Sequence, residues 1–395
     1  MAISKKIEGY MSKSSWIRKM FEQGEALRKQ YGDGNVFDFT LGNPLPEPPE
    51  KVANTLRDLA LRPPPGAHRY MSNAGYPGTR NAIAQALASE LSMEFSANNV
   101  LMTCGAGGGL NVLLKALLDP GDEVIIIAPY FVEYLFYIDN HGGKAVTVNA
   151  NSDFDLDVPA IANALTAQTK AVIICTPNNP TGVVYSQQTL TSLGIILAEH
   201  EQLHGTDVYL VSDEPYRKIV FDNKKCPSLF HSYHNSIMVT SHSKDLALPG
   251  ERIGYVAISP NAKPQQALMD AMIFTNRTLG FVNAPATMQR VAEACQDVTV
   301  NIDFYQTKRD LLVAGLTGIG YQLVKPGGAF YLFPKCPIEN DVEFINLALK
   351  KNVLLVPGSG FGTPGFFRIA YCTITDDMIE RAMPAFKALY DECAR

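Results

Sequence analysis

The sequence has no segment that could hold the chain in a membrane or mark it for export. None of its 395 residues lies in an uninterrupted apolar run of ~18 residues, the length that a transmembrane helix requires. Lys5 and Lys6 do not precede an apolar stretch of the kind found in signal peptides. The sequence therefore predicts a cytoplasmic protein without a membrane partner.

Positive charge is also too scarce to predict a general affinity for nucleic acids. The chain has 34 Lys and Arg residues against 39 Asp and Glu residues, so its net charge is −5. Proteins that bind nucleic-acid backbones usually carry a broad basic surface. We therefore expect small molecules, and not DNA or RNA, as ligands.

Paired cysteines and clustered histidines are missing as well. His200 and His204 lie four residues apart near an expected helix end, where solvated or capping roles are commoner than zinc binding. We expect no bound metal. The seven cysteines are odd in number, scattered and without C-x-x-C spacing, which predicts reduced core thiols: Cys104, Cys175, Cys226, Cys295, Cys336, Cys372 and Cys393.

Short apolar runs alternate with helical patterns through the middle of the chain. This alternation is typical of an α/β fold in which helices flank both faces of a mainly parallel sheet. With 46% hydrophobic residues, the chain can bury enough core for two lobes. The expected strands cover residues 123–128, 145–148, 170–175, 207–212, 236–240 and 253–258.

The two ends of the chain follow different patterns. After about residue 290 we expect one long helix through Cys295 and Leu311, strands around Phe330 and Phe367, and a helix from Asp376. The predicted parts are an N-terminal segment (1–49), a large domain (50–290) and a smaller α+β domain (291–395). An amphipathic helix over residues 14–31, with an apolar face free to lie across a partner subunit, is indicated by Trp16, Ile17, Met20, Phe21 and Leu27.

Ser241-His242-Ser243-Lys244, followed eight residues later by Arg252, is the segment that says most about chemistry. Burial and a nearby guanidinium lower the pKa of a lysine, whose amine can then attack a carbonyl. The serines and the arginine can bind a phosphate. Pyridoxal 5'-phosphate carries both groups, so the segment predicts a site for this cofactor. A solvated surface lysine is the alternative that this segment alone leaves open.

Two expected strands end in polar residues that suit the same cofactor. Catalytic side chains of open α/β sheets lie at the carboxyl ends of the strands. Asn179, in T-P-N-N-P-T-G, can donate to the ring oxygen, and so can Tyr216, in S-D-E-P-Y. Asp213 can pair with a protonated ring nitrogen, which keeps the ring an electron sink.

A glycine-rich turn precedes another expected helix. Gly105, Ala106 and Gly107 follow a short apolar strand and lead into a helical pattern. Unhindered backbone amides at a helix N-terminus bind phosphate well. The turn therefore predicts a phosphate site, although tight packing explains most turns of this kind.

Together these motifs resemble the class I/II aminotransferases, the fold-type I pyridoxal-phosphate enzymes that include aspartate and aromatic aminotransferases. The resemblance runs from Gly42 to Arg368 and implies a large domain with a seven-stranded sheet. It implies that Lys244 forms the Schiff base and that Asp213 partners the pyridine nitrogen. The phosphate ligands that it implies are Ser241, Ser243, Arg252 and the backbone of Ala106 and Gly107.

The resemblance also implies a homodimer with composite sites. Phe131 aligns with the aromatic residue that stacks on the cofactor, where many relatives have tryptophan. Tyr70 matches a tyrosine that reaches the cofactor phosphate of the neighbouring subunit. From the residues alone, Tyr70 can equally be an ordinary loop aromatic.

Arg368 is a single cation in an apolar run, where it must meet either a structural carboxylate or that of a substrate. The resemblance favours the α-carboxylate of the substrate, with which a guanidinium forms two parallel hydrogen bonds. It also makes Asn179 and Gly42 substrate contacts, with a simple turn as the alternative for Gly42.

The leading prediction is an aminotransferase that moves an amino group from an L-amino acid to a 2-oxo acid. A carbon–sulfur β-lyase or a decarboxylase of the same fold is the second reading, because the electron sink serves all these reactions. A pyridoxal-binding transcription regulator is a remote third, since only about forty residues precede Gly42. Arg277 is a candidate for a distal carboxylate, or else an exposed arginine.

Overall fold

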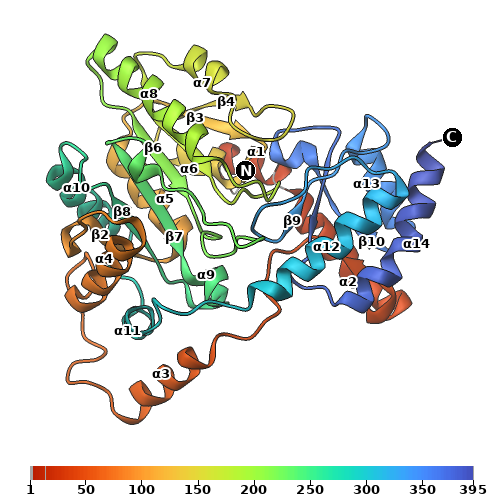
Figure 1. The fold of residues 1–395 in the computed structure, drawn as a ribbon, viewed down its shortest axis with the longest axis horizontal. Coiled ribbons are helices and arrows are strands. Elements are labelled where there is room, and N and C mark those ends of the chain that lie inside the picture. The colour runs from red at the N-terminus through yellow and green to blue at the C-terminus, as the bar shows by residue number, and fades with distance from the viewer. Residues whose placement is uncertain (1–2, 14, 395) are drawn as a thin grey trace.

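The computed structural model describes residues 3–13 and 15–394, and no helix in this part of the chain is long and apolar enough to cross a membrane. A seven-stranded sheet forms the centre of the larger body (Figure 1), in the order β2-β8-β7-β6-β5-β3-β4. Only β8 runs antiparallel to its neighbours, which confirms the mainly parallel α/β fold. The strands are β2 (Val100–Thr103), β3 (Glu123–Ala128), β4 (Lys144–Asn149), β5 (Thr169–Cys175), β6 (Tyr209–Asp213), β7 (Ser236–Ser241) and β8 (Gly254–Ile258).

The central strands read as continuous apolar runs because helices cover both faces of the sheet. In β3, Val124 and Ile126 pack into one buried cluster, and Ile125 and Ile127 into the cluster on the opposite face. Helices α5 (Gly105–Leu117), α6 (Glu133–Asn140) and α10 (Gln265–Thr278) cover the first face. The second face is covered by α3 (Glu50–Leu61), α4 (Pro77–Leu91), α7 (Val158–Ala164), α8 (Gln187–His204) and α11 (Ala286–Ala294).

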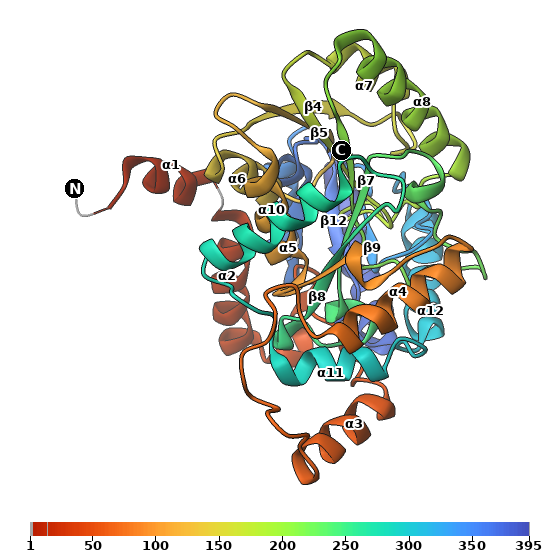
Figure 2. The ribbon, with the colours of Figure 1, turned by 90° about the vertical axis from the view of Figure 1, so that its left-hand side faces the viewer.

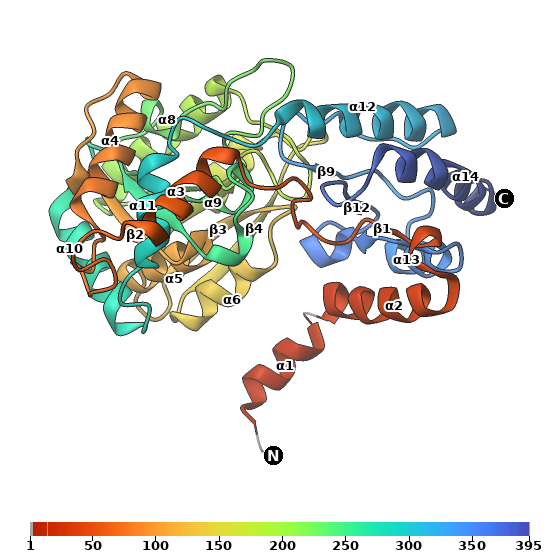
Figure 3. The ribbon, with the colours of Figure 1, turned by 90° about the horizontal axis from the view of Figure 1, so that it is seen from below.

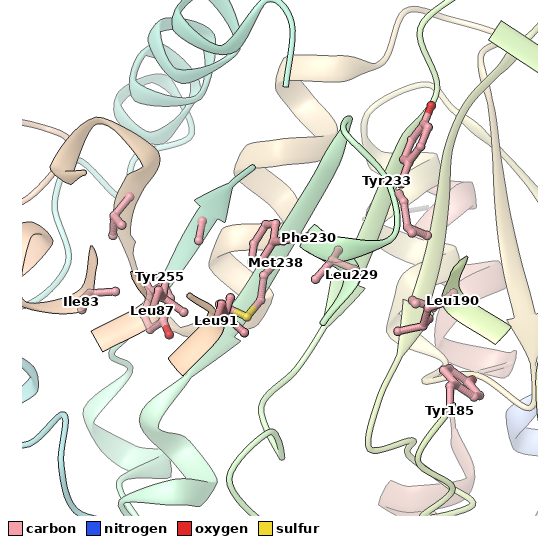
Figure 4. Packing of buried hydrophobic residues seen from close by; sticks show 14 of the residues in the cluster. Ile83, Leu87, Leu91, Tyr185, Leu190, Leu229, Phe230, Tyr233, Met238 and Tyr255 are labelled. Carbon is pink, nitrogen blue, oxygen red and sulfur yellow. The ribbon is translucent and has the colours of Figure 1, made fainter. Parts of the chain in front are cut away.

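Figure 4 shows part of the cluster on this second face. Leu87 and Leu91 of α4, Leu190 of α8, and Met238 and Tyr255 of the sheet belong to it. All five side chains are buried. The rigid sheet between two packed helical layers fixes the positions of the strand ends, where the polar residues lie.

The smaller body has its own core (Figure 3, right). It contains a three-stranded antiparallel sheet in the order β11-β12-β9, and β1 pairs with β10 in parallel, so residues before the large sheet complete this body. Its elements are β1 (Phe37–Asp38), α12 (Ile302–Ile319), β9 (Tyr331–Leu332), α13 (Asp341–Leu349), β10 (Val353–Leu354), β11 (Val356–Pro357), β12 (Phe367–Ala370) and α14 (Asp376–Cys393).

Two helices precede these bodies. Helix α2 (Ser15–Tyr31) confirms the expected N-terminal helix, and α1 (Lys5–Lys13) precedes it and projects outward (Figure 2). Helix α1 touches α6, because the Tyr10 and Phe136 rings lie 4.8 Å apart. The side chains of Trp16, Ile17, Met20 and Phe21, on which the amphipathic prediction depended, lie outside the described residues.

The long helix predicted through Cys295 and Leu311 is wrong. The chain leaves helical geometry at Cys295 and starts α12 only after Asn301, whose side chain caps that helix by accepting from the Asp303 amide (3.0 Å). Between the two helices, the Val300 amide donates to the Asp245 carbonyl at 2.8 Å. Hydrogen bonds to a distant segment thus replace those that a continuous helix would have made.

The cysteines and the paired histidines occupy structural positions. All seven cysteines are free in the described residues. Four of them are buried, as the prediction of core thiols requires, whereas Cys104, Cys226 and Cys393 are only half-buried. His200 lies in α8, and its Nε2 is 3.1 Å from the Thr166 carbonyl oxygen. His200 is therefore a buried residue with a backbone partner.

Candidate active site

A cavity of about 290 Å³ opens at the carboxyl ends of β5, β6 and β7, facing β9 and β12 of the smaller body. All residues predicted for the site line this cavity, except Gly105 and Tyr70. The predicted residues that it brings together are Gly42, Ala106, Gly107, Phe131, Asn179, Asp213, Tyr216, Ser241, Ser243, Lys244, Arg252 and Arg368.

Lys244 lies in the short helix α9 (His242–Asp245), directly after β7. Its Nζ donates to the Gly42 carbonyl oxygen at 2.5 Å. Burial lowers the pKa of Lys244 to about 8, and the charges of Arg252 and Arg368 act in the same direction against an opposing effect of Cys372. A buried amine with this pKa is partly uncharged near neutral pH, so it can act as a nucleophile or a base.

Asp213 ends β6 inside the cavity. Tyr134 Oη donates to Asp213 Oδ2 at 2.7 Å, while Oδ1 is buried and has no hydrogen-bond partner among the described residues. Burial raises the pKa of Asp213 to about 7, and the Tyr134 hydrogen bond only partly opposes this rise. The free oxygen therefore calls for a donor, preferably a cationic one, from a bound molecule.

Arg368 projects from β12 into the same cavity and is 4% exposed. Its Nη1 donates to Asn179 Oδ1 at 3.1 Å and its Nη2 to the Thr40 carbonyl at 2.6 Å. The guanidinium also packs against two rings, at 4.9 Å from Tyr331 and 4.8 Å from Phe361. Because Arg368 forms no ion pair with any described residue, the structural carboxylate is absent and the group is available to an anion.

Other residues of the same cavity lining are the groups predicted to bind phosphate. Ser241 and Ser243 are buried there, and Arg252 is held by its Nη1 donating to the Pro249 carbonyl at 3.0 Å. Gly105 starts α5 with a φ of 70°, and a Cβ at this position would lie 2.9 Å from Arg252 Nη2. Gly105 thus lets the helix start approach the guanidinium, although it does not line the cavity itself.

Two tyrosines of the site were missed by the sequence reasoning. Tyr134 supports Asp213, and Tyr331 Oη is 2.8 Å from Tyr216 Oη. Tyr134 lies one helical turn after Phe131, and their rings are 5.7 Å apart, so a search one turn beyond the predicted stacking residue could have found it. No local motif marks Tyr331, which meets Tyr216 only through the tertiary fold.

Two other candidates lie away from the cavity within this chain. Tyr70 is 90% exposed. Arg277 is exposed near the end of α10, where its guanidinium is 5.5 Å from the Phe274 ring. Neither residue can act on the cavity of its own chain from this position.

A comparison with known families agrees with the geometry of this cavity. The sequence profile of the family "Aminotransferase class I and II" matches residues 34–386. The chain belongs to this family. Amino-group transfer therefore describes its reaction better than the lyase alternative does, and the family uses pyridoxal phosphate as its cofactor.

Relatives of this aminotransferase carry concordant names. The chain is 31% identical to the probable aspartate aminotransferase of Methanocaldococcus jannaschii over 82% of its own length and 86% of that protein. It is 31% identical to the aspartate/prephenate aminotransferase of Thermus thermophilus, over 91% and 92% of the two chains.

Solved structures show the same fold. An amino transferase from Eubacterium rectale matches with a TM-score of 0.96 and 38% identity, over 100% of both chains. The aspartate aminotransferase of Thermus thermophilus with maleate matches with a TM-score of 0.85 and 28% identity, over 95% of this chain and 96% of that one. The predicted fold and enzyme class are thereby confirmed.

Proposed function

We propose that this aminotransferase uses pyridoxal 5'-phosphate, bound at Lys244, to move the amino group of an L-amino acid to a 2-oxo acid. The observation that carries the proposal is the unpartnered, buried Oδ1 of Asp213 in a cavity that also holds Lys244, Arg252 and Arg368. Such a cavity matches a ligand with one cationic ring nitrogen and several anionic oxygens.

The remaining groups of the cavity fit the same cofactor. Ser241, Ser243, Arg252 and the start of α5 would hold its phosphate, because they combine hydroxyls, a guanidinium and helix N-terminal amides. Phe131 would stack on its ring. When bound, pyridoxal phosphate supplies an aldehyde that joins an amine and a ring that withdraws electrons.

Asn179 and Tyr216 would donate to the oxygen of the cofactor ring. Asn179 uses its Oδ1 to accept from Arg368, which leaves its amide hydrogens as donors. The Tyr216 hydroxyl is paired with that of Tyr331, so one proton of this pair can be offered to a ligand. Burial raises the pKa of Tyr216 well above its usual value, so this hydroxyl stays a donor at neutral pH.

Two groups would act on the substrate itself. Arg368 would bind the α-carboxylate with two prongs, and the backbone of Gly42 would close over the same group. These contacts with the α-carboxylate would turn the substrate Cα toward Lys244. The Nζ atom of Lys244, with its lowered pKa, would then take the α-proton and return it.

The proposal includes a homodimer in which Tyr70 of each chain reaches the phosphate in the partner's cavity. The 90% exposure of Tyr70 within one chain is compatible with such a role. We also propose domain boundaries at residues 1–49, 50–290 and 291–395. Support comes from the buried cluster around β9, β12 and α14 and from the pairing of β1 with β10.

Incubation of the purified holoenzyme with a panel of L-amino acids, with and without 2-oxoglutarate or pyruvate, tests the proposed reaction. We expect a new amino acid to form only when the 2-oxo acid is present. Release of pyruvate and ammonia without a 2-oxo acid would instead establish the lyase reaction.

A further inference from the structure

A second cavity, of about 360 Å³, lies beside the strand ends that carry the catalytic residues. Side chains alternate along β6 and β7, so Asp213 and Ser241 line the active-site cavity, whereas Glu214 and Thr240 line the second one. Lys244 lines only the active-site cavity. The residues of the second cavity that matter below include two that are labelled in Figure 4, Leu87 and Tyr255, and four polar ones, Glu90, Glu214, Arg217 and His242.

Two buried side chains of the second cavity each have a polar atom without a partner. His242 is 3% exposed and Glu214 is 1% exposed. Among the described residues, neither His242 Nε2 nor Glu214 Oε1 has a hydrogen-bond partner. Ser212 Oγ, which is buried near Glu214, makes no hydrogen bond of normal geometry either. Unsatisfied polar groups that share one cavity are costly, so they call for a bound molecule that supplies the missing hydrogen bonds.

Both of these free atoms are acceptors. His242 Nδ1 lies 3.1 Å from Asp245 Oδ2, so in the neutral ring Nδ1 carries the hydrogen and Nε2 has only a lone pair. Glu214 Oε2 accepts from Arg217 Nη1 at 2.7 Å, which leaves Oε1 free. The missing partner must therefore donate hydrogen bonds at two points.

The lining also has more negative than positive charge. Arg217 serves two carboxylates at once, because it donates to Glu214 Oε2 and to Glu90 Oε1, both at 2.7 Å. The other two carboxylates of the lining each pair with a lysine. One negative charge is thus uncompensated, and it favours a cationic donor over a neutral one. Leu87 and the Tyr255 ring add apolar surface for the body of such a ligand.

We propose that the second cavity binds a small organic cation with several N–H donors, of the guanidinium class, on a short apolar chain. A planar guanidinium can donate in two directions at once, as Glu214 and His242 require. This inference goes beyond amino-group transfer and does not depend on it, because neither Lys244 nor Arg368 lines the second cavity. The ligand is therefore a molecule other than the substrate.

Ethylguanidinium and ethylurea are matched probes, because they have nearly the same shape and only the first is charged. Calorimetry on the wild-type holoenzyme should show one ethylguanidinium bound per chain, about tenfold or more tighter than ethylurea. Both probes lack an aliphatic amine, so they do not compete with Lys244 for the cofactor. Equal affinity for the two probes, or no binding of ethylguanidinium up to about 10 mM, would overturn the inference.

Two substitutions test the acceptors separately. His242→Asn keeps an N–H donor for Asp245 and removes the free acceptor, whereas Glu214→Gln keeps the shape and removes the charge. Each should weaken ethylguanidinium binding about tenfold, and either variant suffices if the other does not fold. Asp270→Asn is the matched control, since this exposed carboxylate on α10 does not line the cavity and its loss should leave the affinity unchanged.

A crystal structure of the holoenzyme with ethylguanidinium should place the cation beside Glu214 and His242. A cation found only beside Lys244 would refute the inference, and so would unchanged affinity in the folded cavity variants. If no amino acid reacts with any 2-oxo acid, the proposed function fails, yet the binding measurements still decide whether the second cavity is a cation site.

Discussion

Replacement of Arg368 by lysine tests the orientation in which the substrate is bound. The guanidinium has two hydrogen bonds inside the protein, to Asn179 Oδ1 at 3.1 Å and to the Thr40 carbonyl at 2.6 Å. It is also packed against two aromatic rings. This arrangement holds the plane of the group so that the substrate can approach a preoriented, two-pronged donor.

Lysine keeps the positive charge but offers a single point of contact. One charge-assisted hydrogen bond is worth about 1.5–3 kcal/mol, so the loss of one of the two hydrogen bonds to the α-carboxylate should lower kcat/KM about 10-fold to 150-fold. The ammonium also cannot serve Asn179, Thr40 and a carboxylate in the same geometry. Because every substrate carries the α-carboxylate, the loss should be similar for all of them.

Steady-state measurements with aspartate, glutamate, alanine and an aromatic amino acid check this expectation. Arg277→Ala serves as the control, since it should weaken only the dicarboxylates if Arg277 acts on substrates at all. The cofactor content of the Arg368→Lys variant should equal that of the wild type. A loss confined to one substrate class would show that Arg368 selects side chains and that the proposed orientation is wrong.

Substitutions at three further residues probe the cofactor site. Lys244→Ala should leave a folded protein that binds pyridoxal phosphate weakly and without a covalent bond. In the wild type, borohydride reduction followed by peptide mapping should find the cofactor on Lys244. A labelled peptide without Lys244 would refute the assignment. Asp213→Ala should slow proton abstraction in single turnovers far more than it weakens substrate binding, so near-normal rates would mean that another group keeps the ring protonated. Without cofactor, the pKa of Asp213 is raised from 3.8 to about 7, so the free energy of unfolding should fall as the pH rises from about 4 to about 7. Asp213→Asn should remove this pH dependence, which denaturant titrations would measure. Tyr70→Phe should reduce cofactor affinity by the worth of one charge-assisted hydrogen bond, about 1.5–3 kcal/mol at most, and an active monomer in sedimentation would contradict the composite site.

The sheet was predictable because its strands are buried on both faces. Runs such as 123–128 and 170–175 are apolar after a charged first residue, and each became an inner strand of the sheet, β3 and β5. The reversed direction of β8 was not predicted, since apolar content does not encode direction. The interruption after Cys295 depends on the Asp245 carbonyl, which lies far away in sequence, so helical periodicity alone could not reveal it.

The same distinction applies to the site. Asp213 ends a strand, and Asn179 and Lys244 lie within four residues after one. Parallel topology brings strand ends together, so the meeting of these residues could be predicted from the sequence. Tyr331 contacts Tyr216, from which it is 115 residues distant in the sequence. A contact of this kind forms only in the folded chain, so no local sequence pattern marks it.

The charged side chains around the cavity favour ligand binding at the expense of the stability of the free protein. Lys244, Arg252 and Arg368 converge there with Asp213, yet none of these four side chains forms an ion pair with another described residue. Charges left unpaired in a partly buried site destabilise the free protein. A ligand that pairs them recovers this free energy on binding, so cofactor and substrate should both raise the free energy of unfolding. A cavity that instead satisfied its own charges would be more stable and would have no group left to hold either molecule.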